Sequence, residues 1–141
     1  MFKKVLVAAD GTTTAKRAVE VAASLAAMAG GALHIVTVQS PKNVAESLLP
    51  GEFKHVHDDG GVSALLQDLS FIAKAQGLDP VLHHAGGEPA DAIIETAAQI
   101  EADLVVVGNR GMKGARRVLG SVPNSVAHGV NCSIMVVDTS E

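Results

Sequence analysis

The chain has 141 residues, of which 48% are apolar, with a formal net charge of −4 and a pI near 5.8. A chain of this length and composition can bury one compact core without metal or disulfide staples, so a single domain spanning residues 1–141 is predicted. The acidic balance argues against broad binding to a nucleic-acid backbone. With no Trp or Tyr and only three Phe, a base-stacking surface is not expected either.

Targeting and redox features point to a soluble, cytoplasmic protein. The sequence has no apolar run of about eighteen residues, so no membrane contact is expected. Phe2-Lys3-Lys4 leads into a short valine-rich run rather than a signal peptide. Cys132 is the single cysteine and cannot form an internal disulfide, which fits a reducing compartment.

Short apolar runs rich in β-branched residues recur along the chain, as buried parallel strands require. Strands are expected at residues 4–9, 33–38, 104–107 and 134–137, with a weaker one at 80–84. Apolar stripes of helical spacing lie between them: Ala15, Ala18, Val19, Ala22, Leu25 and Ala26; Val62, Leu65, Leu66, Leu69 and Ile72; Ala90, Ile93, Ile94, Ala97 and Ile100. This alternation predicts an α/β fold: an open parallel sheet with helices on both faces, joined by right-handed crossovers.

The connecting segments carry their own signals. Gly30-Gly31 and Gly77 are placed to end the first two helices in left-handed backbone, and Pro89 suits the first turn of the third. The connection at 39–60 is long and polar, with a short helix expected near 43–49. Connections of this length are usually functional or mobile.

A glycine-rich, basic segment, VVVGNRGMKGARRVLGSVPNS, follows the strand expected at 104–107. Parallel sheets bind ligands beyond the carboxyl ends of their strands, and glycines let main-chain N–H groups approach a ligand closely. Ser121 is expected as the N-cap of a helix with Pro123 in its first turn, and Val122, Val126 and Ala127 as its buried stripe. The free amides and positive end of such a helix suit a phosphate. Four cations are placed to neutralise it: Arg110, Lys113, Arg116 and Arg117.

The glycine spacing is GxxGxxG, so neither the P-loop pattern GxxxxGK[ST] nor the dinucleotide pattern GxGxxG is present. A P-loop NTPase and a dinucleotide dehydrogenase are therefore not supported. The alternative to a phosphate site is that the glycines only turn the chain and the cations form a solvated face.

These motifs resemble the universal stress protein family. Its ATP-binding members carry G-x2-G-x9-G-[ST] after the fourth strand, and here Gly108-Asn109-Arg110-Gly111 is followed by Gly120-Ser121. Eight residues, 112–119, stand where the family pattern has nine. The resemblance spans the chain, from VLVAADGTTTAKRAVEVA through LHIVTV and GGEPADAIIETAAQIEADLVVVG to GVNCSIMVV.

The resemblance implies a sheet ordered 3-2-1-4-5, a homodimer through the last strand, and ATP or a related adenine nucleotide, with or without Mg²⁺, between the first and fourth strands. Asp10 and Val38 would flank adenine and ribose, and the glycine segment would hold ribose and phosphates. The implied cofactor-binding set is Ala8, Ala9, Asp10, Val38, Val107, Gly108, Arg110, Gly111, Gly120, Ser121, Val122 and Pro123. Pro123 stands where the family often has a hydroxyl-bearing residue.

Other polar residues have simpler interpretations. Asp10 is as well explained by a capping or Asx turn before the first helix as by a ligand contact, and Thr12 and Thr13 are expected as caps. A loop explains His55, His57, Asp58 and Asp59 better than a metal site, because no metal spacing is present. His83 and His84 must face opposite sides of a strand, and His128 suits the end of the last helix. Cys132 is expected as a small core residue.

The implied function is a nucleotide-binding sensor or regulatory module in stress response, without assigned catalytic residues. The second hypothesis is a dimeric interaction protein of the same fold that binds no nucleotide, and the eight-residue spacing favours it. Efficient ATP hydrolysis is not expected, because Asp10 is the only obvious carboxylate near the loop and phosphoryl transfer needs a positioned water and usually a metal. Dimerisation also has a physical motive, since an apolar last strand at 134–137 would leave an open sheet edge.

Overall fold

The structure, a computed structural model, describes residues 1–9, 13–39, 59–109 and 121–139. The expected helix near 43–49, Asp10, Thr12 and the His55, His57 and Asp58 group lie outside this part of the chain. The elements in chain order are β1 (Lys4–Ala9), α1 (Thr13–Ala29), β2 (Ala32–Gln39), α3 (Asp59–Ala75), β3 (Val81–Gly86), α4 (Pro89–Ile100), β4 (Leu104–Gly108), α5 (Ser121–Gly129) and β5 (Ser133–Val137).

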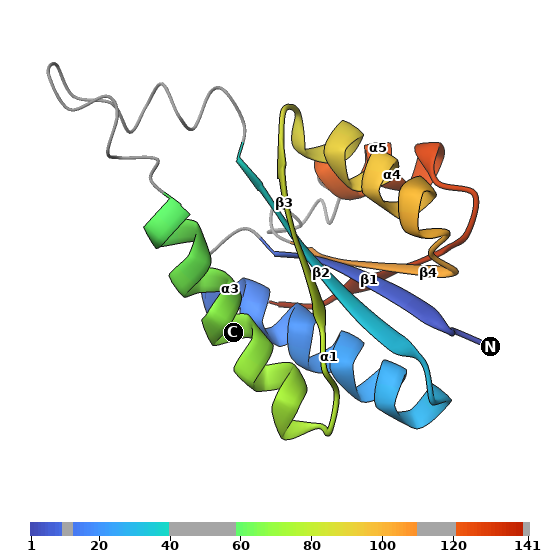
Figure 1. Cartoon of the computed structure of the whole chain (residues 1–141). Coiled ribbons are helices and arrows are strands. Elements are labelled where there is room, and N and C mark those ends of the chain that lie inside the picture. Colours follow the sequence, from blue (N-terminus) through green and yellow to red (C-terminus); the bar gives the residue numbers. More distant parts are fainter. Residues whose placement is uncertain (10–12, 40–58, 110–120, 140–141) are drawn as a thin grey trace, which may run out of the picture.

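All five strands form one parallel sheet in the order β3-β2-β1-β4-β5, as expected. β1 matches its predicted range, whereas β3 runs from Val81 to Gly86 instead of from Pro80 to His84. Proline has no N–H to give to a strand ladder, so Pro80 precedes the strand. After β3 the chain crosses through α4 to β4, on the far side of β1, so the strand order reverses between β1 and β4 (Figure 1).

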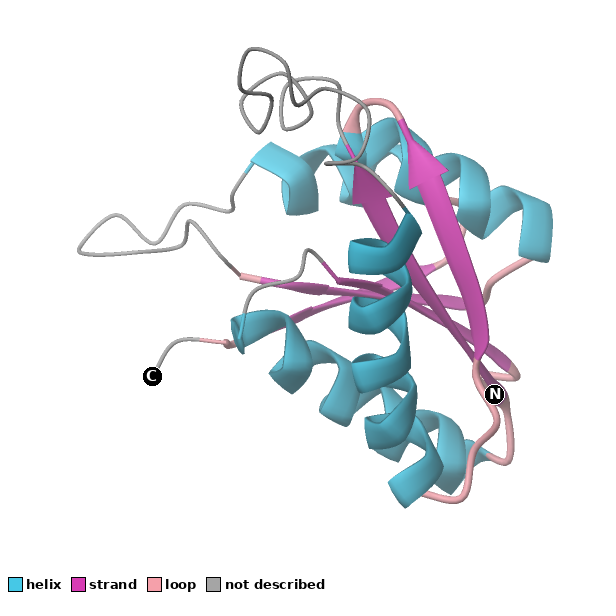
Figure 2. Cartoon of the chain, turned by 60° about the vertical axis from the view of Figure 1, so that its left-hand side comes forward, coloured by secondary structure: helices cyan, strands magenta, loops and turns pink. Residues whose placement is uncertain are grey.

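The sheet separates two hydrophobic cores. α1 and α3 cover one face, and α4 and α5 cover the other (Figures 1 and 2). The first core holds the predicted α1 stripe together with Leu66 and Leu69 of α3, and the second holds Ile93 and Ala97 of α4. The β1 residues alternate between these cores, because successive strand side chains face opposite sides of a sheet. Among the described helices, none is long and apolar enough to cross a membrane.

The helix ends follow the glycine and proline signals with one refinement. Gly30 and Gly77 have φ of 68° and 81° and end α1 and α3 in left-handed backbone, and Pro89 lies at the start of α4. Gly31 does not have a positive φ. It is required for a different reason, since a Cβ there would collide with the carbonyl oxygen of Phe2.

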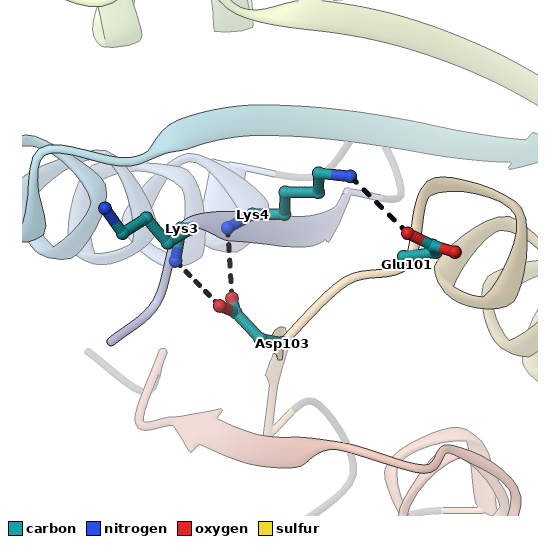
Figure 3. A network of polar contacts seen from close by, with 4 residues as sticks. All are labelled: Lys3, Lys4, Glu101 and Asp103. Atoms are coloured by element: carbon teal, nitrogen blue, oxygen red, sulfur yellow. Dashed lines mark hydrogen bonds and ion pairs between the residues drawn. The ribbon is translucent and has the colours of Figure 1, made fainter.

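Asp103 fastens the amino ends of β1 and β4 together (Figure 3). Its Oδ2 accepts a hydrogen bond from the Lys3 amide at 2.7 Å and its Oδ1 from the Lys4 amide at 3.0 Å, while its own amide donates to the Lys4 carbonyl at 3.0 Å. Hydrogen bonds to a charged acceptor contribute about 1.5–3 kcal/mol each, at the low end when exposed. The exposed Lys4–Glu101 ion pair, at 3.9 Å, adds at most about 1 kcal/mol.

A pair of histidines joins β2 to the edge strand β3. His34 Nδ1 and His83 Nε2 lie 2.9 Å apart, whereas the ring centroids are 5.2 Å apart and the ring planes differ by 20°. The two distances differ by about one ring diameter, so both nitrogens lie on the line between the centroids. The contact is therefore an in-plane hydrogen bond rather than a face-to-face stack. It needs one N–H and one lone pair, and it breaks when both nitrogens carry protons.

The environment of this pair disfavours added protons. Burial lowers the pKa of His34, as do the neighbouring charges of His83 and of Lys4 on β1, and burial lowers the pKa of His83. The Lys4 ammonium that acts on His34 is itself paired with the carboxylate of Glu101, at the end of α4. Because both folded-state pKa values lie below those of the unfolded chain, the stability this pair contributes is complete above about pH 6.5 and is lost as the pH falls below it.

We expect the free energy of unfolding, measured with urea, to be lower at pH 5.5 than at pH 7.5, and part of that difference to disappear in His83→Gln. His84→Gln is the matched control, because His84 is the next residue on β3 and is exposed on the opposite face. The control should keep the wild-type pH dependence. An unchanged pH dependence in His83→Gln would contradict the assignment.

Candidate functional site

β1 and β4 separate at their carboxyl ends. Their ladder covers Val5–Val7 and Leu104–Val106, whereas β1 stays paired with β2 through Ala9 and β4 with β5 through Gly108. The opening is therefore confined to the one strand pair at which the strand order reverses. The helix after β1 packs on one face and the helix after β4 on the other, which leaves the ends of the two strands between them. Open α/β sheets bind ligands at such a point.

Four of the predicted site residues form an apolar wall on the α4/α5 face. Val107 is 3% exposed, and Ala8, Val38 and Val122 are partly buried against the same cluster. They come from β4, β1, β2 and α5, so the fold assembles them from four separate elements. The wall has no aromatic side chain and presents only methyl groups.

The remaining predicted site residues divide into three groups. Ala9 lies at the same edge, but its side chain packs into the core on the α1/α3 face. Gly108 is the last residue of β4, and Pro123 is buried in the first turn of α5. Asp10, Arg110, Gly111 and Gly120 lie outside the described residues, and of Ser121 only the backbone is described.

α5 is described from Ser121 onward, and because Gly120 and the Ser121 side chain lie outside the description, Ser121 as N-cap stays a prediction. The buried stripe of α5 differs from the expectation at one position. Val126 is fully buried as expected, but Ala127 is exposed and Pro123 takes its place in the buried stripe. Alanine is compatible with either environment, so its position in an apolar pattern carried little information.

A hydrogen-bonded group next to Gly108 was not predicted. The Asn109 amide donates to the Val137 carbonyl at 3.0 Å, and Asn109 Oδ1 accepts from both the amide and the hydroxyl of Thr139 at 2.9 Å. Asn109 Nδ2 donates to Asp138 Oδ1 at 3.1 Å. We call Asn109, Asp138 and Thr139 the carboxyl-edge clasp. It ties the residue after β4 to the segment after β5.

A cleft among the described residues lies at the other end of the sheet. It has a volume of about 320 Å³ and is bounded by the last turns of α4, the end of α5 and the start of β5. Cys132 lines it, and burial, with a contribution from Asp103, raises the pKa of the Cys132 thiol. A thiol with a raised pKa is a poor nucleophile, so Cys132 acts here as a packing residue. No group of three or more potential ligands in the described residues is arranged to hold a metal ion.

The order 3-2-1-4-5, the two helix layers and the early end of the β1–β4 ladder define an open, doubly wound α/β protein whose strand order reverses between β1 and β4. Comparison with known proteins gives the family. The sequence model of the universal stress protein family matches residues 1–138, and the chain belongs to this family.

Three relatives illustrate the likeness. Universal stress protein Rv1636 of Mycobacterium tuberculosis is 31% identical, covering 99% of this chain and 98% of its own. Universal stress protein YxiE of Bacillus subtilis is 30% identical, covering 97% and 99%. The crystal structure of a universal stress protein in complex with cAMP is 33% identical and superposes with a TM-score of 0.79, covering 99% of this chain and 98% of that one.

Gly108 and Thr139 are in contact, which gives a test of how tightly this edge is packed. A Cβ on residue 108 would lie 3.1 Å from Thr139 Cγ2. The Thr139 methyl group should therefore oppose Gly108→Ala by about 1 kcal/mol of unfolding free energy, at the lower end of the range for overpacking. Thr139→Ser removes that methyl group and keeps the hydroxyl.

We expect urea unfolding to show that Gly108→Ala is more favourable in the Thr139→Ser background than in the unsubstituted protein, by about 1 kcal/mol. Contacting residues show such coupling, whereas distant ones are additive. Additive losses would contradict the contact.

Proposed function

We propose that this protein binds ATP or a related adenine nucleotide at the carboxyl edge between β1 and β4, as a cytoplasmic sensor or regulatory module in stress response. The observation that carries the proposal is the early end of the β1–β4 ladder. β2 stays paired with β1, and β5 with β4, up to the last residues of β1 and β4. The opening is therefore local and not a frayed edge.

The apolar wall supports a purine as the base. Ala8, Val38 and Val122 are aliphatic, only partly buried, and gathered with Val107 on the α4/α5 face near the carboxyl edge. An adenine ring can lie against such a surface, with its polar edge hydrogen-bonded to main-chain groups. Shape and main-chain hydrogen bonds, rather than aromatic stacking, would give selectivity.

The basic glycine segment supports a phosphorylated ligand. The chain is acidic overall, yet Arg110, Lys113, Arg116 and Arg117 fall within eight residues that lead into α5. Cations next to the amino end of a helix favour bound phosphate. The complex of a 33% identical family member with cAMP adds support for an adenine nucleotide.

Calorimetric titration tests the proposal. ATP, ADP, AMP and cAMP, each with and without Mg²⁺, should include at least one ligand that binds, and GTP should bind more weakly. Gly120→Glu should weaken binding at least about tenfold, a change of about 1.4 kcal/mol, because it places a carboxylate in the glycine segment proposed to bind the phosphates. Ala98→Glu is the control, because it makes the same charge change at an exposed α4 position.

Absence of heat with every nucleotide, together with no nucleotide extracted from the purified protein, would reject the binding proposal. It would favour an interaction protein of the same fold, which the eight-residue spacing at 112–119 also favours. We further propose that the protein is not an efficient enzyme. ADP release above that of Gly120→Glu during the ATP titration would contradict this.

We also propose a homodimer through β5. β5 is an edge strand of the sheet, and Ile134, Met135 and Val136 are only partly buried. An apolar edge of this kind exposes unpaired backbone groups unless another chain covers it.

Sedimentation at micromolar concentration should show a dimer, and Ser133→Lys should weaken it by placing a charge at the start of β5. Ser125→Lys, at an exposed position on α5, is the matched control. A monomer for the unsubstituted protein would contradict the proposal.

A further inference from the structure

The carboxyl-edge clasp uses nearly the whole hydrogen-bonding capacity of Asn109. The side-chain oxygen accepts two hydrogen bonds from Thr139, which fills both of its lone pairs, and the side-chain nitrogen donates to Asp138. The main-chain amide donates to Val137. Residue 109 is thus held by four hydrogen bonds to the three consecutive residues 137–139.

The clasp is buried at Thr139 and exposed at Asp138. Thr139 is 5% exposed, although it lies beyond the end of β5, and its methyl group faces Gly108. Moving Thr139 out of this position would break its hydrogen bonds and leave the oxygen of Asn109 without a partner in a place that water reaches poorly. Thr139 is therefore held against the end of β4.

The position of Asn109 in the chain gives this arrangement a consequence. It is the last described residue before the glycine segment at 110–120, and it follows β4 directly. Glycine-rich backbone has little conformational preference of its own, so the direction in which it starts must be imposed by its anchor. Ligand binding by main-chain amides is strong only when those amides are held in place beforehand.

We propose that Asn109 is a positioning residue for the nucleotide site: held by Thr139 and Asp138, it sets the direction in which the phosphate-binding segment leaves β4. The inference rests on the proposed nucleotide function. Asn109 acts through the segment and does not itself contact the ligand. The segment after β5 thereby becomes part of the binding machinery.

The chemistry of the clasp explains why asparagine is needed. Aspartate has the same shape but cannot donate to Asp138, and it would place a second carboxylate about 3 Å from the first, where like charges repel. Alanine would leave the Thr139 hydroxyl, which is buried with its residue, without its acceptor. Asn109→Asp therefore changes one donor and the charge and leaves the side-chain volume almost unchanged.

The experiment compares Asn109→Asp with Asp103→Asn, which weakens the anchor at the opposite end of β4. Both variants should lower the thermal midpoint. Only Asn109→Asp should raise the dissociation constant for ATP or cAMP, by about tenfold, whereas Asp103→Asn should change it less than about twofold. Asn109→Asp/Asp138→Asn restores an amide–carboxylate pair with its roles exchanged, and it should recover most of the lost affinity.

Hydrogen exchange without ligand separates this inference from the proposed function. Amides of residues 110–114 should exchange faster in Asn109→Asp than in Asp103→Asn, whether or not the protein binds a nucleotide. Faster exchange with no nucleotide binding in the unsubstituted protein would reject the proposed function and retain the anchoring by Asn109. Equal exchange in the two variants, or equal loss of affinity, would overturn the inference.

Discussion

The parallel pairing of β1 with β4 is the constraint on which the rest of this structure depends. These strands are about 100 residues apart in the chain. Their pairing joins the half of the sheet that contains β1, β2 and β3 to the half that contains β4 and β5. Asp103 holds their amino ends through two backbone amides. The ladder ends before the strands do, so one contact produces both the continuous sheet and the gap at its carboxyl edge.

β4 is held at both ends by polar side chains that bond in different ways. Asp103 accepts from the backbone of β1, which sets the register of the sheet centre. Asn109 both donates to and accepts from the segment after β5. Between them lie four buried residues, 104–107, which gain their stability from burial on both faces. The fold thus places a buried strand directly before the glycine-rich segment.

Features with a local signal were predictable from the sequence, and features that depend on distant partners were not. The β1 range, the sheet order implied by the family resemblance, Gly30 and Pro89 are all confirmed. Asn109 and Thr139 form no periodic pattern and meet only after β4 and β5 are paired. His34 and His83 likewise lie 49 residues apart, on strands whose register no short window of sequence reveals. Ala127 was wrongly expected in the core, because alanine does not distinguish inside from outside.

The burial of Thr139 bears on how the chain tolerates change. Residues beyond the last element of a domain usually accept tags, fusions and substitutions freely, because few contacts hold them. Here a hydroxyl and a methyl group two positions after β5 lie against the exit of β4. Substitutions at residues 138 and 139 therefore affect the packing at the end of β4. A peptide fused after them must leave the backbone of these two residues undisturbed.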